Sequence, residues 1–278
     1  MTLRIRNRGL LALIALSAFF AAATAALYIY TALTSKIVPP TEVLRLFKFK
    51  DSSFFLFRYN FASSILATAV FPLYALFMSA LIFVRFEKTQ ATEILYFSLF
   101  LFACLCEGAR LFTPLFGLWK TYSSQLVFAG RTVVFGRFLA PMSLLLASIF
   151  GNFTEQQDSE KNMTIVVTAG AVFSMLLPIN TSRVSSANTL CWGFQDVFFA
   201  MRSLIFLAAL LSSAVRILSK NNLSSSYLLL SQTFWLSLTV AGYAILACAD
   251  NFLLLFAGTG LLFVPTLHFL KDTHRLYS

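Results

Sequence analysis

Charged residues are scarce in this chain of 278 residues, in which Asp, Glu, Lys and Arg together make up 12% of the sequence. Soluble globular domains carry about 25% charged residues, so this chain lacks the side chains that would cover a surface in water. Hydrophobic residues make up 59% of it and aromatic residues 16%. These proportions exclude a soluble domain, a disordered chain and a coiled coil, and they predict a protein whose main solvent is lipid.

Histidines, cysteines and catalytic motifs are scarce as well. The chain has two histidines and four cysteines, with no Gly-x-Ser-x-Gly, no His-Glu-x-x-His and no P-loop. The cysteines do not form a disulfide framework, although a bridge between Cys191 and Cys248 is a conceivable alternative. The sequence therefore predicts no metal and no cofactor, and it favours a role other than that of an enzyme.

Long hydrophobic runs are what the chain has in quantity. A transmembrane helix needs about 20 predominantly apolar residues, and a β-barrel would show alternating segments of half that length. The runs therefore predict an all-α integral membrane protein, a helical bundle of about eight transmembrane helices. The eight runs are Gly9–Leu33, Phe61–Val84, Ile94–Gly117, Gln125–Phe150, Thr164–Asn180, Val197–Arg216, Tyr227–Ala249 and Phe252–Leu270.

The first run has two interpretations. Three arginines precede it and Ala23-Thr24-Ala25 resembles a cleavage site, which is the pattern of a signal peptide. The run continues to Leu33, beyond the length of a typical signal core, which favours an uncleaved anchor. The predicted organisation is an N-terminal anchor helix at 1–33, an outer interfacial loop at 34–60 and a seven-helix transmembrane core at 61–278.

The loop at 34–60 is rich in basic and aromatic residues, as in Leu44-Arg45-Leu46-Phe47-Lys48-Phe49-Lys50. This composition predicts a connector that lies at the level of the lipid headgroups. Two alternatives are a short hairpin that turns at Asp51-Ser52-Ser53 and a lid over an outer cavity.

Lysines and arginines near the ends of the runs predict the orientation in the cell membrane. With the N-terminus inside, the cytoplasmic segments hold ten of them and the outer segments hold seven, five of these in the 34–60 loop. Both termini are then cytoplasmic, and the mature N-terminus lies outside if residues 1–25 are cleaved. The net charge of +10 reflects this bias and an affinity for anionic headgroups, so we expect no nucleic-acid partner.

A few charged residues remain inside the predicted spans. A charge near the bilayer centre costs at least ~2.5–3.5 kcal/mol on insertion scales, so its presence calls for a partner or a function. Glu107 lies three residues before Arg110 and shares its helical face. At a rise of about 1.5 Å per residue, these charges lie between the middle and the outer end of their spans. The arginines are Arg110, Arg131, Arg137 and Arg202.

These five residues are the candidate ligand-binding site, an outward-facing polar cavity for a small anionic or amphiphilic ligand. Arginine stays charged and offers a planar fork to a carboxylate or phosphate. The structural alternative is that Glu107 pairs with Arg137 between two spans, while Arg131 reaches the headgroups. The candidate residues are Glu107, Arg110, Arg131, Arg137 and Arg202.

The predicted function is therefore that of a sensor or binding protein in the membrane. Its predicted partners are the lipid bilayer, a small anionic ligand and a separate membrane or cytoplasmic protein. The alternatives are a structural, complex-forming membrane subunit and a transporter of a small anion. The transporter is less favoured, because the two halves show no internal repeat and the inner half of the bundle is expected to lack polar residues.

Overall fold

The computed structural model describes residues 3–34, 55–87, 89, 91–117, 119, 123–150, 158–219 and 223–277. The described part is almost entirely helical, which confirms the all-α class. The segments at 44–50 and 51–53, for which a headgroup connector, a hairpin or a lid was expected, lie outside the described residues. The α-helices are α1 (Leu3–Thr34), α3 (Phe61–Phe86), α4 (Thr92–Cys106), α5 (Phe112–Leu115), α6 (Ser124–Phe150), α7 (Ser159–Leu176), α8 (Gln195–Ser219), α9 (Leu223–Ala247) and α10 (Phe252–Tyr277). The 3₁₀-helices are η2 (Phe55–Phe57) and η3 (Glu107–Leu111), and the strands are β1 (Ile179–Val184) and β2 (Leu190–Trp192).

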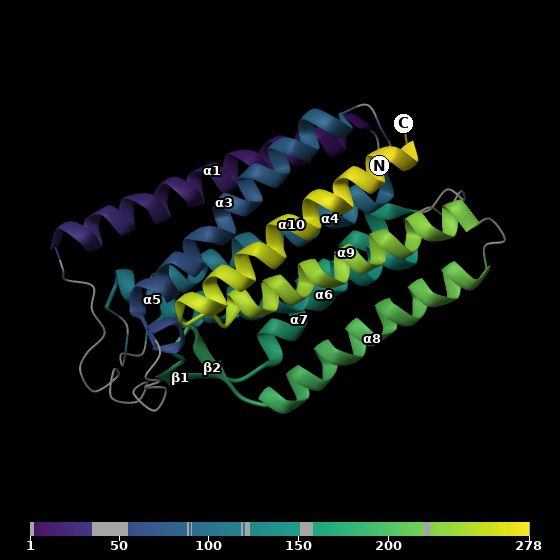
Figure 1. Cartoon of the computed structure of the whole chain (residues 1–278). Helices are drawn as coiled ribbons and strands as arrows, with labels where there is room; N and C mark the ends of the chain where they lie inside the picture. Colours follow the sequence, from purple (N-terminus) through teal and green to yellow (C-terminus); the bar gives the residue numbers. More distant parts are fainter. Residues whose placement is uncertain are drawn as a thin grey trace.

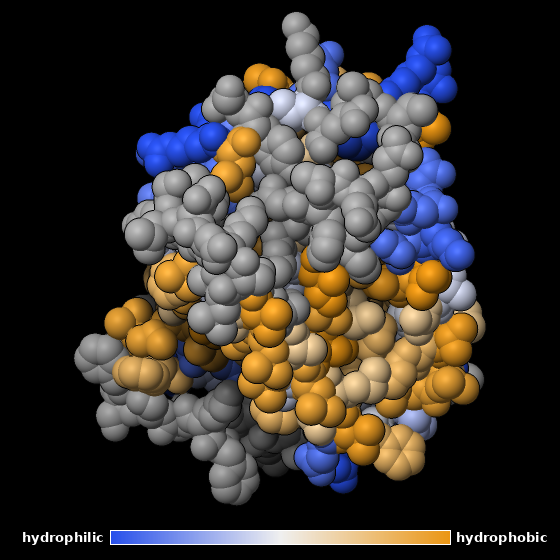
Figure 2. Space-filling model, turned by 90° about the vertical axis from the view of Figure 1, so that its right-hand side faces the viewer, coloured by the Kyte–Doolittle hydropathy of each residue, from blue (hydrophilic) through white to orange (hydrophobic). Residues whose placement is uncertain are grey.

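Six helical segments in the described part of the chain are long and apolar enough to cross a membrane. They are α1, α3, α4 continued through η3 and α5, α6, α9 and α10. The remaining two expected spans correspond to α7 and α8, so the count of eight spans stays a prediction. The space-filling view in Figure 2 shows a broad hydrophobic surface with hydrophilic residues above it and a smaller hydrophilic group below. The apolar helices indicate a membrane protein.

The fifth expected span ends earlier than the sequence predicted. Helix α7 stops at Leu176, Leu177 has an extended backbone, and the chain enters β1 at Ile179. Pro178 explains this boundary, because a proline disfavours helical geometry in the residue before it and has no N–H to continue the helix. The predicted helix through Asn180 was therefore wrong over its last residues, which form a strand.

Strands β1 and β2 form an antiparallel hairpin that the sequence analysis missed. Ile179 pairs with Trp192 and Asn180 with Cys191. The tip of the hairpin, residues 185–189, points into the helix bundle, since Ala187, Asn188 and Thr189 are all buried. There the Asn188 side chain donates a hydrogen bond of 3.0 Å to Ser64 Oγ at the start of α3. The hairpin closes one end of the bundle.

The two ends of the bundle differ in what they hold (Figure 1). The N- and C-termini lie together at one end, which we call the terminal end. The β1–β2 hairpin and α5 lie at the opposite end, which we call the hairpin end. Helices α9 and α10 pack against each other along their lengths and are joined at the hairpin end by the turn at residues 248–251. Helices α3, α4, α6, α9 and α10 supply most of the buried core.

Helix α1 packs on α3 and buries one stripe of its surface. The buried positions recur every three or four residues, which is the spacing of one helical face. Near the terminal end, the Arg6 guanidinium donates to the main-chain oxygens of Phe86 at 2.6 Å and Glu87 at 3.1 Å, and also to that of Thr89. A cation thus satisfies the last carbonyls of α3, which have no partner within their own helix.

Candidate functional site

Glu107 and Arg110 lie where the third spanning segment changes its helical geometry. Helix α4 ends at Cys106, and the chain continues as the 3₁₀-helix η3 before it resumes as α5. A 3₁₀ stretch within a long helix often marks a functional hinge or strain. All five residues of η3 are buried. This segment thus places one acidic and one basic side chain inside the bundle, close to the hairpin end.

A close approach of α4 and α6 brings Arg137 to Glu107. A Cβ atom at Gly136 would lie 2.6 Å from Cys106 Cβ and 2.9 Å from the Ala103 oxygen. Only glycine allows the two backbones to come this near. The next residue, Arg137, therefore reaches the neighbouring helix with its guanidinium rather than the lipid.

Glu107 and Arg137 form a two-point ion pair. Arg137 Nε donates to Glu107 Oε1 at 2.8 Å, and Nη2 donates to Oε2 at 3.3 Å. Nη2 also donates to the Ala247 oxygen at 3.0 Å, and the Tyr243 hydroxyl donates to Oε1 at 3.0 Å. Both charged side chains are buried, where charge-assisted hydrogen bonds are strong. The pair between Glu107 and Arg137 is the one that the structural alternative expected. The bonds to Ala247 and Tyr243 connect it in addition to α9.

Arg110 shares the same carboxylate and holds the hairpin tip. Its Nη1 lies 3.5 Å from Glu107 Oε2. Its Nε donates to the Ala187 oxygen at 2.9 Å, and its Nη2 donates to the same oxygen. Arg110 is 2% exposed, and Nη1 makes no hydrogen bond. A main-chain oxygen of the hairpin thus occupies the part of the guanidinium fork that a ligand oxygen would otherwise take.

Arg202 lies beside this cluster on α8. Its Cζ is 5.7 Å from the centre of the Phe198 ring, and it is partly buried. Within the described residues, its guanidinium makes no hydrogen bond and no ion pair. The Trp192 ring packs edge-on against Phe198 at 5.5 Å between centres, and Arg137 Cζ lies 5.2 Å from the Trp192 centre. The indole Nε1 of Trp192 is buried and also has no hydrogen-bonding partner in the part of the chain that the structure describes.

Arg131 is separate from the other candidates. Its Nη1 donates to the Met175 oxygen at 2.7 Å in an exposed bond near the end of α7. The structure therefore brings together Glu107, Arg110 and Arg137, places Arg202 next to them, and leaves Arg131 outside the cluster. Arg131 is a useful matched control for experiments on the others.

Two further acidic residues near the hairpin end, Asp196 and Asp250, have different surroundings. Asp196 is exposed at the start of α8. Asp250 is buried in the turn between α9 and α10, where it accepts hydrogen bonds from Ser186 Oγ at 2.7 Å and Asn251 Nδ2 at 3.3 Å. Burial and the nearby charge of Asp250 raise the pKa of the Tyr59 hydroxyl above its ordinary value. Asp250 thus anchors the hairpin tip through its hydrogen bond with Ser186.

Sequence reasoning missed three contributors to this site: Tyr243, Ala187 and Trp192. Tyr243 is one aromatic residue among many in a hydrophobic run, and nothing in its spacing marks it. Ala187 and Trp192 belong to the unexpected hairpin. Pro178, followed by the polar residues Asn180-Thr181-Ser182, was the available signal that a span ends there.

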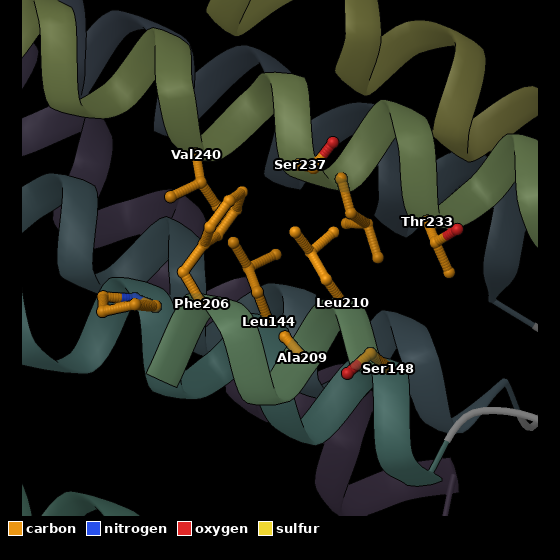
Figure 3. Close-up of a pocket in the computed structure, with 10 residues that line it drawn as sticks. Leu144, Ser148, Phe206, Ala209, Leu210, Thr233, Ser237 and Val240 are labelled. Atoms are coloured by element: carbon orange, nitrogen blue, oxygen red, sulfur yellow. The ribbon is translucent and has the colours of Figure 1, made fainter. Parts of the chain in front are cut away.

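The pocket drawn in Figure 3 is not continuous with the arginine cluster. It lies between α6, α8 and α9, is lined mainly by apolar side chains such as Leu144, Phe206 and Val240, and has a volume of about 20 Å³. The hydroxyl groups at its wall, those of Ser148, Thr233 and Ser237, donate to carbonyls of their own helices. Such a volume accommodates about one water molecule, so this pocket is too small for a ligand.

Polar side chains are also buried between the middle of the bundle and the terminal end, in the half that the sequence predicts to be the inner one and to lack polar residues. They connect α3, α9 and α10, and the bonds nearer the terminal end lie between α9 and α10. The hydrogen bonds are Tyr74–Thr266 at 2.7 Å, Thr239–Thr266 at 3.3 Å, Gln232–Thr273 at 3.0 Å and Ser231–Asp272 at 2.6 Å. Most of these groups are uncharged hydroxyls and amides within hydrophobic runs, so the cost of burying charge does not single them out in the sequence.

Comparison with known proteins identifies one relative and no family. No family model and no solved structure matches the chain. The chain is 37% identical over 99 residues to an uncharacterized protein of Treponema pallidum (strain Nichols). This stretch covers 35% of the chain and 28% of the relative, so the chain matches little more than a quarter of that protein's length. The similarity assigns no activity.

Proposed function

We propose that this protein is a multi-pass membrane sensor or binding protein that takes up a small anion, or the anionic headgroup of an amphiphile, at its hairpin end. One observation carries the proposal: Arg110 and Arg137 share the single buried carboxylate of Glu107. These three side chains leave a surplus of one positive charge. The partly buried Arg202 adds another cation next to them.

A surplus charge in this position favours an anionic ligand for an electrostatic reason. Coulomb interactions are stronger in the low dielectric of a protein interior or a membrane than in water, and burying a charge is costly unless it is paired. An anion that reaches Arg202 would compensate the surplus. The indole N–H of Trp192 is a second buried donor without a partner among the described residues, and the Trp192 ring packs against the same Phe198 ring.

The proposal includes the location and orientation predicted from the sequence. We place the protein in the cell membrane with eight spans, both termini in the cytoplasm and the hairpin end outside. In support, Arg6, Lys271 and Arg275 belong to helix ends at the terminal end, as the positive-inside rule expects of the cytoplasmic side. A ligand would then approach Arg202 from the outer side or from the outer leaflet.

Substituting Arg202→Gln should weaken anion binding at least tenfold and leave the fold intact. Arg202 makes no hydrogen bond or ion pair in the described part of the chain, so its loss leaves no buried partner uncompensated. A hydrogen bond to a charged group contributes about 1.5–3 kcal/mol, which predicts a loss of affinity of tenfold or more. Thermal unfolding of the detergent-solubilised protein, measured with increasing acetate or butyl phosphate, reports this change.

The matched control is Arg131→Gln, which removes an arginine of similar depth outside the cluster. The unfolding midpoint of this variant should rise on addition of the anion as that of the wild type does. If neither anion stabilises the wild type, or if Arg202→Gln and Arg131→Gln respond alike, the proposed site is wrong.

A second candidate function, transport of a small anion, is favoured by the buried hydroxyl and amide groups nearer the terminal end. A transporter needs polar groups on both sides of its central site, and Thr266, Tyr74 and Gln232 provide such groups. Liposomes that contain the protein should then accumulate more radiolabelled phosphate than liposomes without it. Binding without uptake would support the binding protein over the transporter.

A further inference from the structure

A long apolar groove runs along α7 on the side that faces α8. It has a volume of about 750 Å³ and is lined by one face of α7 together with Phe138 of α6 and Met201 of α8. The side chains of α7 that line it are mostly hydrophobic, such as Ile165 and Val172, with the hydroxyl of Thr168 between them. Helices α7 and α8 both pack against α6, and the groove lies alongside it between them.

Stacked aromatic rings connect this groove with Arg202. Phe138 stacks on Phe173 at 4.9 Å between ring centres, and both line the groove. Phe173 in turn stacks on Phe198 at 6.0 Å. Phe198 is the ring over which the Arg202 guanidinium lies. Phe173, at the end of the groove nearest the hairpin, is therefore separated by one aromatic ring from a cation that has no anionic partner among the described residues.

We propose that the ligand is an anionic lipid, whose acyl chain lies in this groove and whose phosphate or carboxylate binds Arg202. This inference rests on the proposed function and names the ligand class for that site. A small anion would engage Arg202 but leave the groove without an occupant. An acyl chain accounts for both features, because its hydrocarbon fits the apolar wall and its headgroup supplies the missing negative charge.

The dimensions of the groove agree with an acyl chain. Phe173 and Thr164 are nine residues apart on α7, which corresponds to about 14 Å along the helix axis. One leaflet of a bilayer has a hydrocarbon thickness of roughly 15 Å, half of the ~30 Å core. An acyl chain lying along this stretch of α7 would therefore have a length comparable with one leaflet and would end before Lys161, the cation at the far end of the groove.

The test varies the length of the ligand tail and blocks the groove. The probes are butyl, octyl and dodecyl phosphate, and binding is measured on the full chain in a mild non-ionic detergent. The groove-blocking variant is Ala169→Trp, because Ala169 is an exposed residue of α7 that lines the groove. The control is Ala208→Trp, which places the same bulk at an exposed position of α8 outside the groove.

We expect the wild type to bind more tightly as the tail lengthens, by up to roughly fourfold for each buried methylene. The control should show the same dependence. Ala169→Trp should bind butyl phosphate as the wild type does, but should lose at least tenfold in affinity for dodecyl phosphate.

Two results overturn the inference, and they are distinguishable from a failure of the proposed function. If Ala169→Trp and the wild type show the same dependence on tail length, the tail does not occupy the groove. If Ala169→Trp instead converts a dimer of the wild type into a monomer without changing lipid binding, the groove is a contact between copies. In both cases butyl phosphate still binds through Arg202. Failure of the proposed function would show as no binding of butyl phosphate that depends on Arg202.

Discussion

Substituting Glu107→Gln should lower the stability of the folded protein by about 3–5 kcal/mol, the usual cost of removing one partner from a buried ion pair. Glu107 is fully buried and is the shared counterion of Arg137 and Arg110. A glutamine keeps the shape and one oxygen acceptor, but it leaves two buried guanidinium groups without a negative charge. The midpoint of thermal unfolding in detergent measures the loss.

A matched control for this prediction is Asp272→Asn near the terminal end. Asp272 accepts a hydrogen bond from Ser231 and lies 4.0 Å from the largely exposed guanidinium of Arg275, so the loss of its charge should cost less than about 1 kcal/mol. The triple variant Glu107→Gln, Arg110→Met, Arg137→Met should recover part of the stability, because the uncompensated charges are then gone. Equal midpoints for Glu107→Gln and Asp272→Asn would show that the buried cluster does not hold the bundle together.

Substituting Arg6→Met should destabilise the protein by about 2–3 kcal/mol if α1 is retained as a helix of the bundle. Arg6 donates to three main-chain oxygens at and beyond the C-terminal end of α3. Hydrogen bonds to a charged group contribute about 1.5–3 kcal/mol, and a cation near the end of a helix adds a favourable interaction with the helix dipole. Thermal unfolding of the purified protein, together with the mass of its N-terminal peptide, tests this.

The control is Arg8→Met, because Arg8 is exposed two residues further along α1. It should leave the unfolding midpoint unchanged. A signal peptide gives the opposite pattern: the mature protein would lack residues 1–25, and Arg6→Met would have no effect on it. The experiment therefore decides between the two interpretations of the first hydrophobic run.

The helical part of the fold could be predicted because it follows from length and hydropathy. Each of the eight hydrophobic runs coincides with a helix over most of its length, and the short turn at Asp250-Asn251 separates two helices that pack together. The β1–β2 hairpin could not be predicted in the same way. Its first residues continue the apolar run of α7, and its position depends on contacts with distant residues such as Ser64 and Asp250.

The residues of the buried charge cluster were predictable from the sequence, but their partners were predictable only in part: the pair between Glu107 and Arg137 was one of two interpretations, and the contact of Arg110 with the hairpin was not expected. The cost of burying charge in a membrane selects Glu107, Arg110, Arg137 and Arg202 from the sequence, and the structure places them together near the hairpin end. Helical spacing predicts the direction in which a side chain leaves its own helix, but it does not identify the residue of a neighbouring helix that the side chain contacts. Arg131 was included because of its depth, and its contact with Met175 separates it from the others.

The functional proposal depends on whether the surplus positive charge at Arg202 binds an anion. The most direct measurement is a structure of the protein determined by electron microscopy in the presence of dodecyl phosphate. The account predicts phosphate density within hydrogen-bonding distance, about 3 Å, of the Arg202 guanidinium, with the tail along α7. Phosphate density at Arg131 or at the membrane surface, with none at Arg202, would contradict it.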